Sequence, residues 1–143
     1  DLVRFPDNEA IQTAGCDVLT TLCMHPSNRD PLCAIGAVSP ILQCLRLHPD
    51  ARACQQAAST AISFLARAPR ARVLFLNLGA VPAVCHTLHS HANSPSVVAA
   101  ACRALAALVG AIQEPFVHVR DAPDPATAAQ ARRQIFSVNG DGA

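Results

Sequence analysis

The sequence predicts an all-α fold built from repeated groups of three helices, on three observations. The segment Gly36-Ala37-Val38 recurs as Gly79-Ala80-Val81, 43 residues later. The same 43-residue shift aligns apolar and small residues at spacings of three and four, which is the pattern of one buried helix face. Hydrophobic residues make up 51% of the 143 residues and charged residues 15%, so the chain has enough apolar surface to fold. Three helices in about 43 residues are typical of helical solenoids.

The longest helix expected in each group shows the clearest alignment. We expect each aligned column to be buried, with small residues where a neighbouring helix approaches closely. The columns are Ile11, Cys54 and Val97; Ala14, Ala57 and Ala100; Gly15, Ala58 and Ala101; Val18, Ala61 and Ala104; Leu19, Ile62 and Leu105; and Leu22, Leu65 and Leu108.

Two shorter helices precede each long helix. Gly36 and Gly79 end the first of them, because glycine adopts the left-handed cap conformation at little cost. Pro40 and Pro82 then fall in the first turn of the middle helix, where a missing amide hydrogen does little harm. The aligned residues of the short helices are Leu32, Cys33 and Ile35 with Phe75, Leu76 and Leu78, and those of the middle helices are Val38, Ile41, Leu42 and Leu45 with Val81, Val84, Cys85 and Leu88.

These elements predict a single domain over residues 1–143. The third helix of a preceding repeat occupies 8–23, two repeats follow at 26–66 and 69–109, and a partial, degenerate repeat occupies 112–138. In the last repeat, Asp124 and Pro125 are interpreted as the cap and first-turn proline of a middle helix over Ala126–Phe136. Neither end has an obvious polar cap of the kind terminal solenoid repeats need. We therefore expect a fragment of a longer array, or a small array whose ends meet partners.

Over roughly residues 8 to 110 the chain resembles the armadillo-repeat family. The resemblance rests on Gly-Ala-Val, a proline and a leucine-spaced middle helix, followed by Ala-Ala-x-x-Ala-Ile/Leu-x-x-Leu. Arg29 and Arg72 also match the basic residue that often opens the first helix of that repeat. The resemblance implies a right-handed α-solenoid, an ARM/HEAT-like superhelix whose third helices line a concave groove that binds an extended peptide or another protein.

The resemblance also implies which residues face this groove. Importin-alpha and β-catenin place a backbone-clamping Asn where this chain has Thr21, Phe64 and Ala107, so we expect neither that clamp nor a nuclear-import adaptor. Importin-alpha also carries Trp one turn earlier, and the chain differs there as well. Phe64 fits two interpretations, an anchor for a partner and a side chain packed between adjacent third helices. The predicted groove residues are Thr13, Asp17, Thr21, Gln56, Thr60, Phe64, Ala99, Arg103 and Ala107.

Two weaker groups of residues have competing interpretations. Cys85, His86, His89 and His91 form the densest set of potential metal ligands. Cys85 belongs to a buried column, however, and His48 occupies the repeat position of His91, so we interpret these positions as structural and predict no metal or cofactor.

Arg67, Arg70 and Arg72 surround Pro69 between two repeats. Such a loop could hold a phosphate or an acidic peptide, but we favour solvated charge at a helix junction.

Composition and motifs narrow the function classes. Net charge is +1 and aromatic residues make up 3%, which argues against nucleic-acid binding. No apolar run is long enough to span a bilayer. The chain has no Gly-rich phosphate loop, GxSxG or HExxH motif, so we predict that it is not an enzyme.

The expected function is that of a protein–protein interaction module or scaffold. The alternative is a structural or self-association segment of a larger scaffold, acting through exposed solenoid ends, and a remote alternative is a metal-binding or thiol-dependent protein. The seven cysteines are odd in number and include no CxxC pair, which favours free thiols in a reducing, cytoplasmic location. A nuclear or cytoskeletal location also fits.

Overall fold

The computed structural model describes residues 2–110, and all regular structure within them is helical. The all-α prediction is confirmed for this part of the chain, whereas the partial repeat expected at 112–138 lies outside it. The helices are α1 (Glu9–Cys23), α2 (Pro26–Ala34), α3 (Val38–Leu47), α4 (Arg52–Leu65), α5 (Pro69–Asn77), α6 (Ala80–Ser90) and α7 (Pro95–Leu108).

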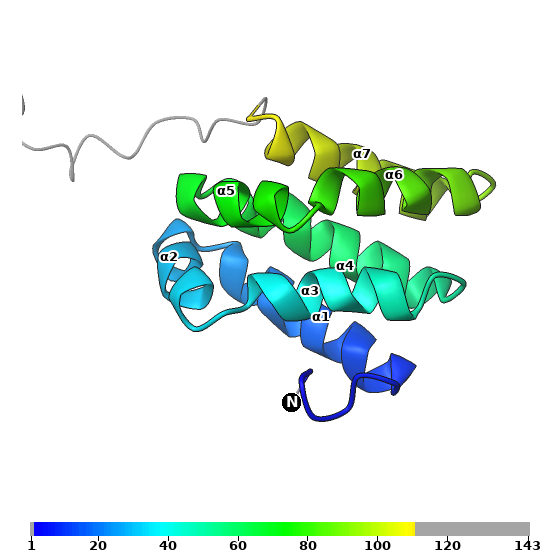
Figure 1. Ribbon diagram of the computed structural model, residues 1–143, viewed down its shortest axis with the longest axis horizontal. Helices are drawn as coiled ribbons and strands as arrows, with labels where there is room; N and C mark the ends of the chain where they lie inside the picture. Colours follow the sequence, from blue (N-terminus) through cyan, green and yellow to red (C-terminus); the bar gives the residue numbers. More distant parts are fainter. Residues whose placement is uncertain (1, 111–143) are drawn as a thin grey trace, which may run out of the picture. The chain divides into compact units, whose positions relative to one another are not determined.

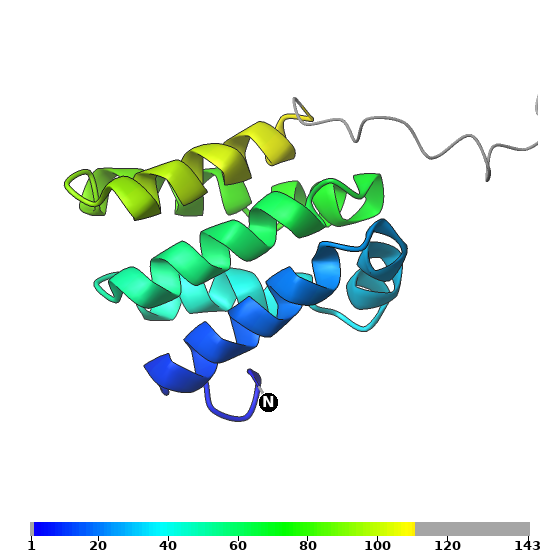
Figure 2. The ribbon, with the colours of Figure 1, turned by 180° about the vertical axis from the view of Figure 1, so that it is seen from behind.

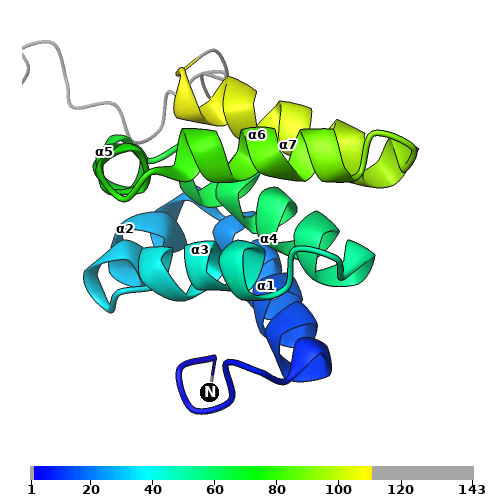
Figure 3. The same ribbon diagram turned by 45° about the vertical axis from the view of Figure 1, so that its right-hand side comes forward.

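The three longest helices, α1, α4 and α7, lie side by side, with α4 in the middle (Figures 1 and 2). The middle helices α3 and α6 pack against α4 and α7 respectively, and they contact each other (Figure 3). The short helices α2 and α5 also contact each other. The order short, middle, long therefore occurs twice, after a first long helix.

No single helix among residues 2–110 is long and apolar enough to cross a membrane. The helices α5 and α6 reach the required length and apolar content only when taken together, and they meet at a bend of 75°.

Proline and glycine lie at the helix ends, and Pro40 and Pro82 fall in the first turns of α3 and α6 as the sequence predicts. Pro26, Pro69 and Pro95 begin α2, α5 and α7, where proline loses no intrahelical hydrogen bond. Gly36 and Gly79 follow α2 and α5 with φ of 84° and 78°. That left-handed conformation is strained for any residue with a side chain, so the chain can turn there into α3 and α6.

Hydrogen bonds of two buried glutamines recur at the 43-residue shift. Gln12 Nε2 donates to the carbonyl oxygens of Leu2 and Phe5, at 2.8 and 2.9 Å. Gln55 Nε2 does the same 43 residues later, and its acceptors are the carbonyls of Leu45 and His48, at 2.9 and 2.8 Å. The repeat therefore extends to the polar contacts that tie each long helix to the segment before it.

The two histidines of one repeat column behave in the same way. His48 Nε2 donates to the carbonyl of Pro6, and His91 Nε2 donates to the carbonyl of Pro49, both at 2.7 Å. This geometry confirms that the column is structural. It also shows that residues 2–6 take the position of the end of α3 and the loop after it, which the sequence analysis missed although Leu2 and Pro6 align with Leu45 and Pro49.

The predicted columns are buried in α4 and, apart from the half-buried Leu105, in α7, but not all of them are buried in α1. Ala14, Val18 and Leu22 of α1 are exposed, Val18 by 59%. The expectation that they are buried is wrong, because this stripe packs against the preceding long helix and none precedes α1 among the described residues. Their equivalents in α4, which face α1, and in α7, which face α4, are Ala57, Ala61, Leu65, Ala100, Ala104 and Leu108, all buried.

Cys85 is a second correction, because it is exposed rather than buried. Its equivalent in α3 is Leu42, which is 1% exposed. Helix α3 is covered by α5 and α6 of the next group, whereas α6 has no later group beside it among residues 2–110. Position in the array, which periodicity does not report, decides the burial of these equivalent residues.

Candidate protein-binding groove

Eight of the nine predicted groove residues lie on a stripe of the three long helices that the neighbouring helices leave open. Asp17, Thr21, Gln56, Ala99 and Arg103 are exposed, and Thr13, Thr60 and Phe64 are half-buried. We call these eight residues the groove stripe. On each long helix, the stripe lies between the column that faces the preceding long helix and the column that faces the following one.

Ala107 does not belong to this stripe. It is fully buried in the apolar core, so its side chain is out of reach of a partner. The repeat aligns it with Thr21 and Phe64, but at this position of α7 the side chain is enclosed by the core. A methyl group there fills core space rather than groove surface.

A hollow of about 320 Å³ lies between α1 and α4. Four residues of the groove stripe, Thr13, Asp17, Gln56 and Thr60, line it together with Ala53 and Ala57. At its edge the hydroxyl of Thr13 lies 3.1 Å from Cys54 Sγ. The structure therefore brings these four predicted residues together in one concave, mixed polar and apolar site.

The polar groups of this hollow differ in their freedom to bind a partner. Thr60 Oγ1 donates to the carbonyl of Gln56 at 2.8 Å, so its donor is already used. The carboxylate of Asp17 and the side-chain amide of Gln56 form no hydrogen bond or ion pair with residues 2–110. An amide offers both donors and an acceptor to a peptide backbone, and a carboxylate offers only acceptors.

Phe64 combines the two interpretations left open by the sequence. Its ring is half-buried and packs against the apolar core. The guanidinium of Arg67 lies 4.6 Å from the ring centroid, so one partner for the exposed part of the ring is already present. The geometry favours packing over a free anchor.

The arginines near Pro69 do not act as one cluster. Arg67 covers Phe64, and its Nε donates to the carbonyl of Ser63 at 3.2 Å. Arg70 is exposed and Arg72 is half-buried. With Arg67 engaged on α4, the structure does not add to the case for an anion site.

The candidate metal ligands on α6 are dispersed. His86 Nε2 is paired with the hydroxyl of Ser90 at 3.4 Å, and His91 is held by the carbonyl of Pro49. Among residues 2–110, no group of three or more His, Cys, Asp and Glu side chains is placed to hold a metal ion.

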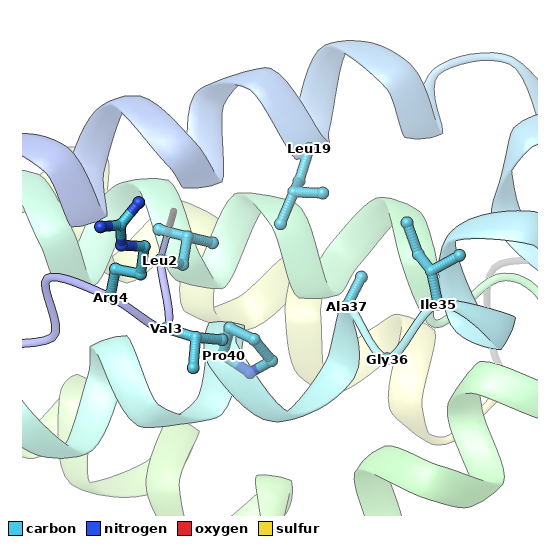
Figure 4. A pocket seen from close by; sticks show the side chains of 8 residues that line it. All are labelled: Leu2, Val3, Arg4, Leu19, Ile35, Gly36, Ala37 and Pro40. Atoms are coloured by element: carbon cyan, nitrogen blue, oxygen red, sulfur yellow. The ribbon is translucent and has the colours of Figure 1, made fainter.

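A second hollow, of about 290 Å³, is mainly apolar (Figure 4). Leu2, Val3, Leu19, Ile35 and Pro40 contribute to its lining. The residue equivalent to Leu19 is Ile62, which is fully buried where α3 packs on α4. In the following group the equivalent position is occupied by α3, which packs on α4. Of the residues that line the hollow, Arg4 is the one with a polar side chain.

All seven cysteines are free thiols, and five of them are buried: Cys16, Cys23, Cys33, Cys44 and Cys54. Burial raises the pKa of Cys23 and of Cys54 from 9.0 to about 11. The side-chain hydrogen bond with Cys16, and then burial, raise the pKa of Cys44 as well. Raised pKa values keep these thiols protonated and poorly nucleophilic at neutral pH.

These thiols predict a loss of stability in alkali. A folded-state pKa above the unfolded value means that the neutral thiol stabilises the fold fully below pH 9, and that this contribution is lost as pH rises towards about 11. The chain has no Lys and no Tyr, so cysteine is the only side chain expected to titrate in that window. We expect the urea midpoint to fall between these pH values.

The measurement is urea unfolding followed by circular dichroism at a series of pH values. Replacing Cys23 and Cys54 by Ala removes two of the titrating groups, so the fall should become shallower. The matched control replaces the exposed Cys85 and Cys102 by Ala and should leave the slope unchanged. An equal slope in both double variants would contradict the assignment to buried thiols.

Comparison with known proteins gives no match: no family model, curated protein or solved structure is similar to the chain.

Proposed function

We propose that the chain is a segment of an armadillo-type solenoid that binds another protein, as an extended peptide, along the groove stripe. The hollow between α1 and α4 carries this proposal, because it gathers Asp17 and Gln56, whose polar groups are free of the described residues. The recurring glutamine and histidine hydrogen bonds support a repeating array of helices. Repeat arrays present extended concave surfaces of this kind.

The expected ligand follows from the groups on the stripe. The amide of Gln56 can donate to a carbonyl and accept from an amide of an extended backbone. Asp17 near one end and Arg103 near the other favour a peptide with opposite charges in the matching order. The protein acts by holding such a segment and catalyses no reaction. Its buried, free cysteine thiols suit a reducing location.

A matched pair of glutamines tests the proposal. Peptides are selected from a random display library against the full chain, and their affinities are then measured by fluorescence polarisation. Gln56→Ala should weaken binding by about tenfold, as expected for one lost amide pairing. Gln43→Ala, at an exposed position of α3 outside the stripe, should leave affinity unchanged. Selected peptides that bind both variants as well as the parent chain would place the site elsewhere and overturn the proposal.

A further inference from the structure

Among residues 2–110 no further helix covers the outer side of α7, which repeats a face that is buried on α4. We call Val98, Cys102, Ala106 and Val109 the trailing face. Val109 is 72% exposed, Cys102 is exposed, and the other two are half-buried. Their equivalents on α4 and just after it are all buried: Gln55, whose side-chain amide bonds to the end of α3 and to α6, and Ser59, Ser63 and Ala66.

Among residues 2–110 no long helix covers the outer side of α1, and this side carries the complementary face. We call Ile11, Ala14, Val18 and Leu22 the leading face. The equivalent residues of α4 lie at its contact with α1, and those of α7 lie at its contact with α4. All of them are buried: Cys54, Ala57, Ala61 and Leu65 on α4, and Val97, Ala100, Ala104 and Leu108 on α7. Each contact between long helices therefore joins a trailing face to a leading face.

The two open faces fit each other by size and polarity. Neither contains a charged residue. Ala14 on one side and Cys102 and Ala106 on the other are small, which favours close packing of two helices. Both faces expose apolar surface that water covers at a cost in free energy.

Charge at the rim of the faces fixes the direction. Asp17, Thr60 and Arg103 occupy one column of the repeat, and Asp17 and Thr60 are neighbours across α1 and α4, where they line the same hollow. Placing α1 of a second copy beyond α7 continues this column. Asp17 of the second copy then lies beside Arg103 of the first, and opposite charges meet.

We propose that the chain self-associates head to tail, with the leading face of α1 in one copy packed on the trailing face of α7 in the next. This contact continues the α1–α4 and α4–α7 contacts already present within one chain. It is heterologous, because the two faces differ, so each added copy leaves one face of each kind available to a further copy. The proposal does not depend on peptide binding in the groove.

Two single variants and their mixture test the direction of assembly. Sedimentation velocity of the full chain, under reducing conditions and over about a hundredfold range of concentration, should show growth of oligomers with concentration. Val18→Glu closes the leading face and Val109→Glu closes the trailing face, so each variant alone should sediment as a monomer. An equimolar mixture should form a dimer and nothing larger, because one intact face of each kind remains.

Matched variants separate this assembly from other outcomes. Val73→Glu is the control and should leave assembly unchanged. Val73 is exposed on α5, and its equivalent Asp30 on α2 is exposed although another group of helices follows α2. Asp17→Arg should weaken assembly by about fivefold, and Arg103→Asp in the same chain should restore it. If Val109→Glu fails to fold by circular dichroism, Cys102→Asp closes the same face.

Three results would overturn the proposal. A parent chain that stays monomeric over the whole range means that the faces do not pair. Slow reaction of Cys102 with a thiol reagent in such a monomer means that another segment or partner covers the trailing face. Oligomers that persist in both single variants, or a mixture that stays monomeric, mean that assembly does not run head to tail.

Discussion

Replacing Gln55 by Leu is expected to lower the free energy of unfolding by about 2–4 kcal/mol, because it removes the buried amide that joins three helices. Gln55 is 1% exposed and donates to the carbonyls of Leu45 and His48 at the end of α3. Its Oε1 accepts from Thr87 Oγ1 of α6. Leucine has a similar volume, so the loss would come from two carbonyls left without a donor rather than from a cavity. Urea unfolding followed by circular dichroism measures it.

The control for this prediction is built into the repeat. Gln12 makes two hydrogen bonds of the same kind, to Leu2 and Phe5, but within residues 2–110 it has no partner equivalent to Thr87. Its acceptors lie in the short segment before α1 rather than at the end of a packed helix. Gln12→Leu should therefore cost clearly less than Gln55→Leu. Equal losses would show that the link to α6 contributes nothing and that only the two carbonyl bonds matter.

The helical periodicity and the turn residues of this chain are local, so the sequence alone predicts the helices well. Gly36 and Gly79 mark the turns, Pro40 and Pro82 mark the first turns of α3 and α6, and the apolar spacing marks the core faces. Columns of apolar or small residues do not contain Gln12 and Gln55, which are polar and buried. The same residue type, Gln, occurs at both positions of the 43-residue shift, and this match is the sequence signal for their shared hydrogen-bonding role.

Burial at the two outer helices could not be predicted in this way. Val18 and Ala61 share a column, yet Val18 is 59% exposed and Ala61 is fully buried. The difference lies in the neighbour that covers each helix, and a neighbour is a long-range property that helical spacing does not contain. The same cause explains why Cys85 is exposed while Leu42 is not.

The candidate site was predictable to the same extent. The columns between the buried ones correctly identify exposed positions such as Asp17 and Gln56. Helix geometry fixes which residues lie between two buried faces, so spacing alone locates them. They fail at Ala107, where the inward packing of the last turn of α7 decides burial. They also do not reveal that Arg67 covers Phe64, since this contact depends on side-chain conformation.

Replacing Phe75 by Ala is expected to have the largest effect on stability, a loss of about 3–5 kcal/mol, because a ring is removed from a fully enclosed site. Phe75 is 0% exposed and is the largest of the fully buried side chains among residues 2–110. It lies on α5, which contacts α2, α3, α6 and α7. A cavity there weakens several helix contacts at once, so both chemical unfolding and thermal melting should shift. Differential scanning calorimetry and urea titration measure the two.

Phe64→Ala is the matched control, since it removes the same ring from a half-buried site on the groove stripe. We expect a smaller loss, about 1–2 kcal/mol, because water already reaches part of that ring and Arg67 can relax onto the remaining surface. The comparison separates core packing from groove packing with one substitution. If Phe64→Ala were as destabilising as Phe75→Ala, Phe64 would have to be a core residue, and the groove stripe would be shortened to its α1–α4 hollow. If Phe64→Ala left stability unchanged but abolished peptide binding, Phe64 would be an anchor after all, and Arg67 would have to swing away to admit the ligand.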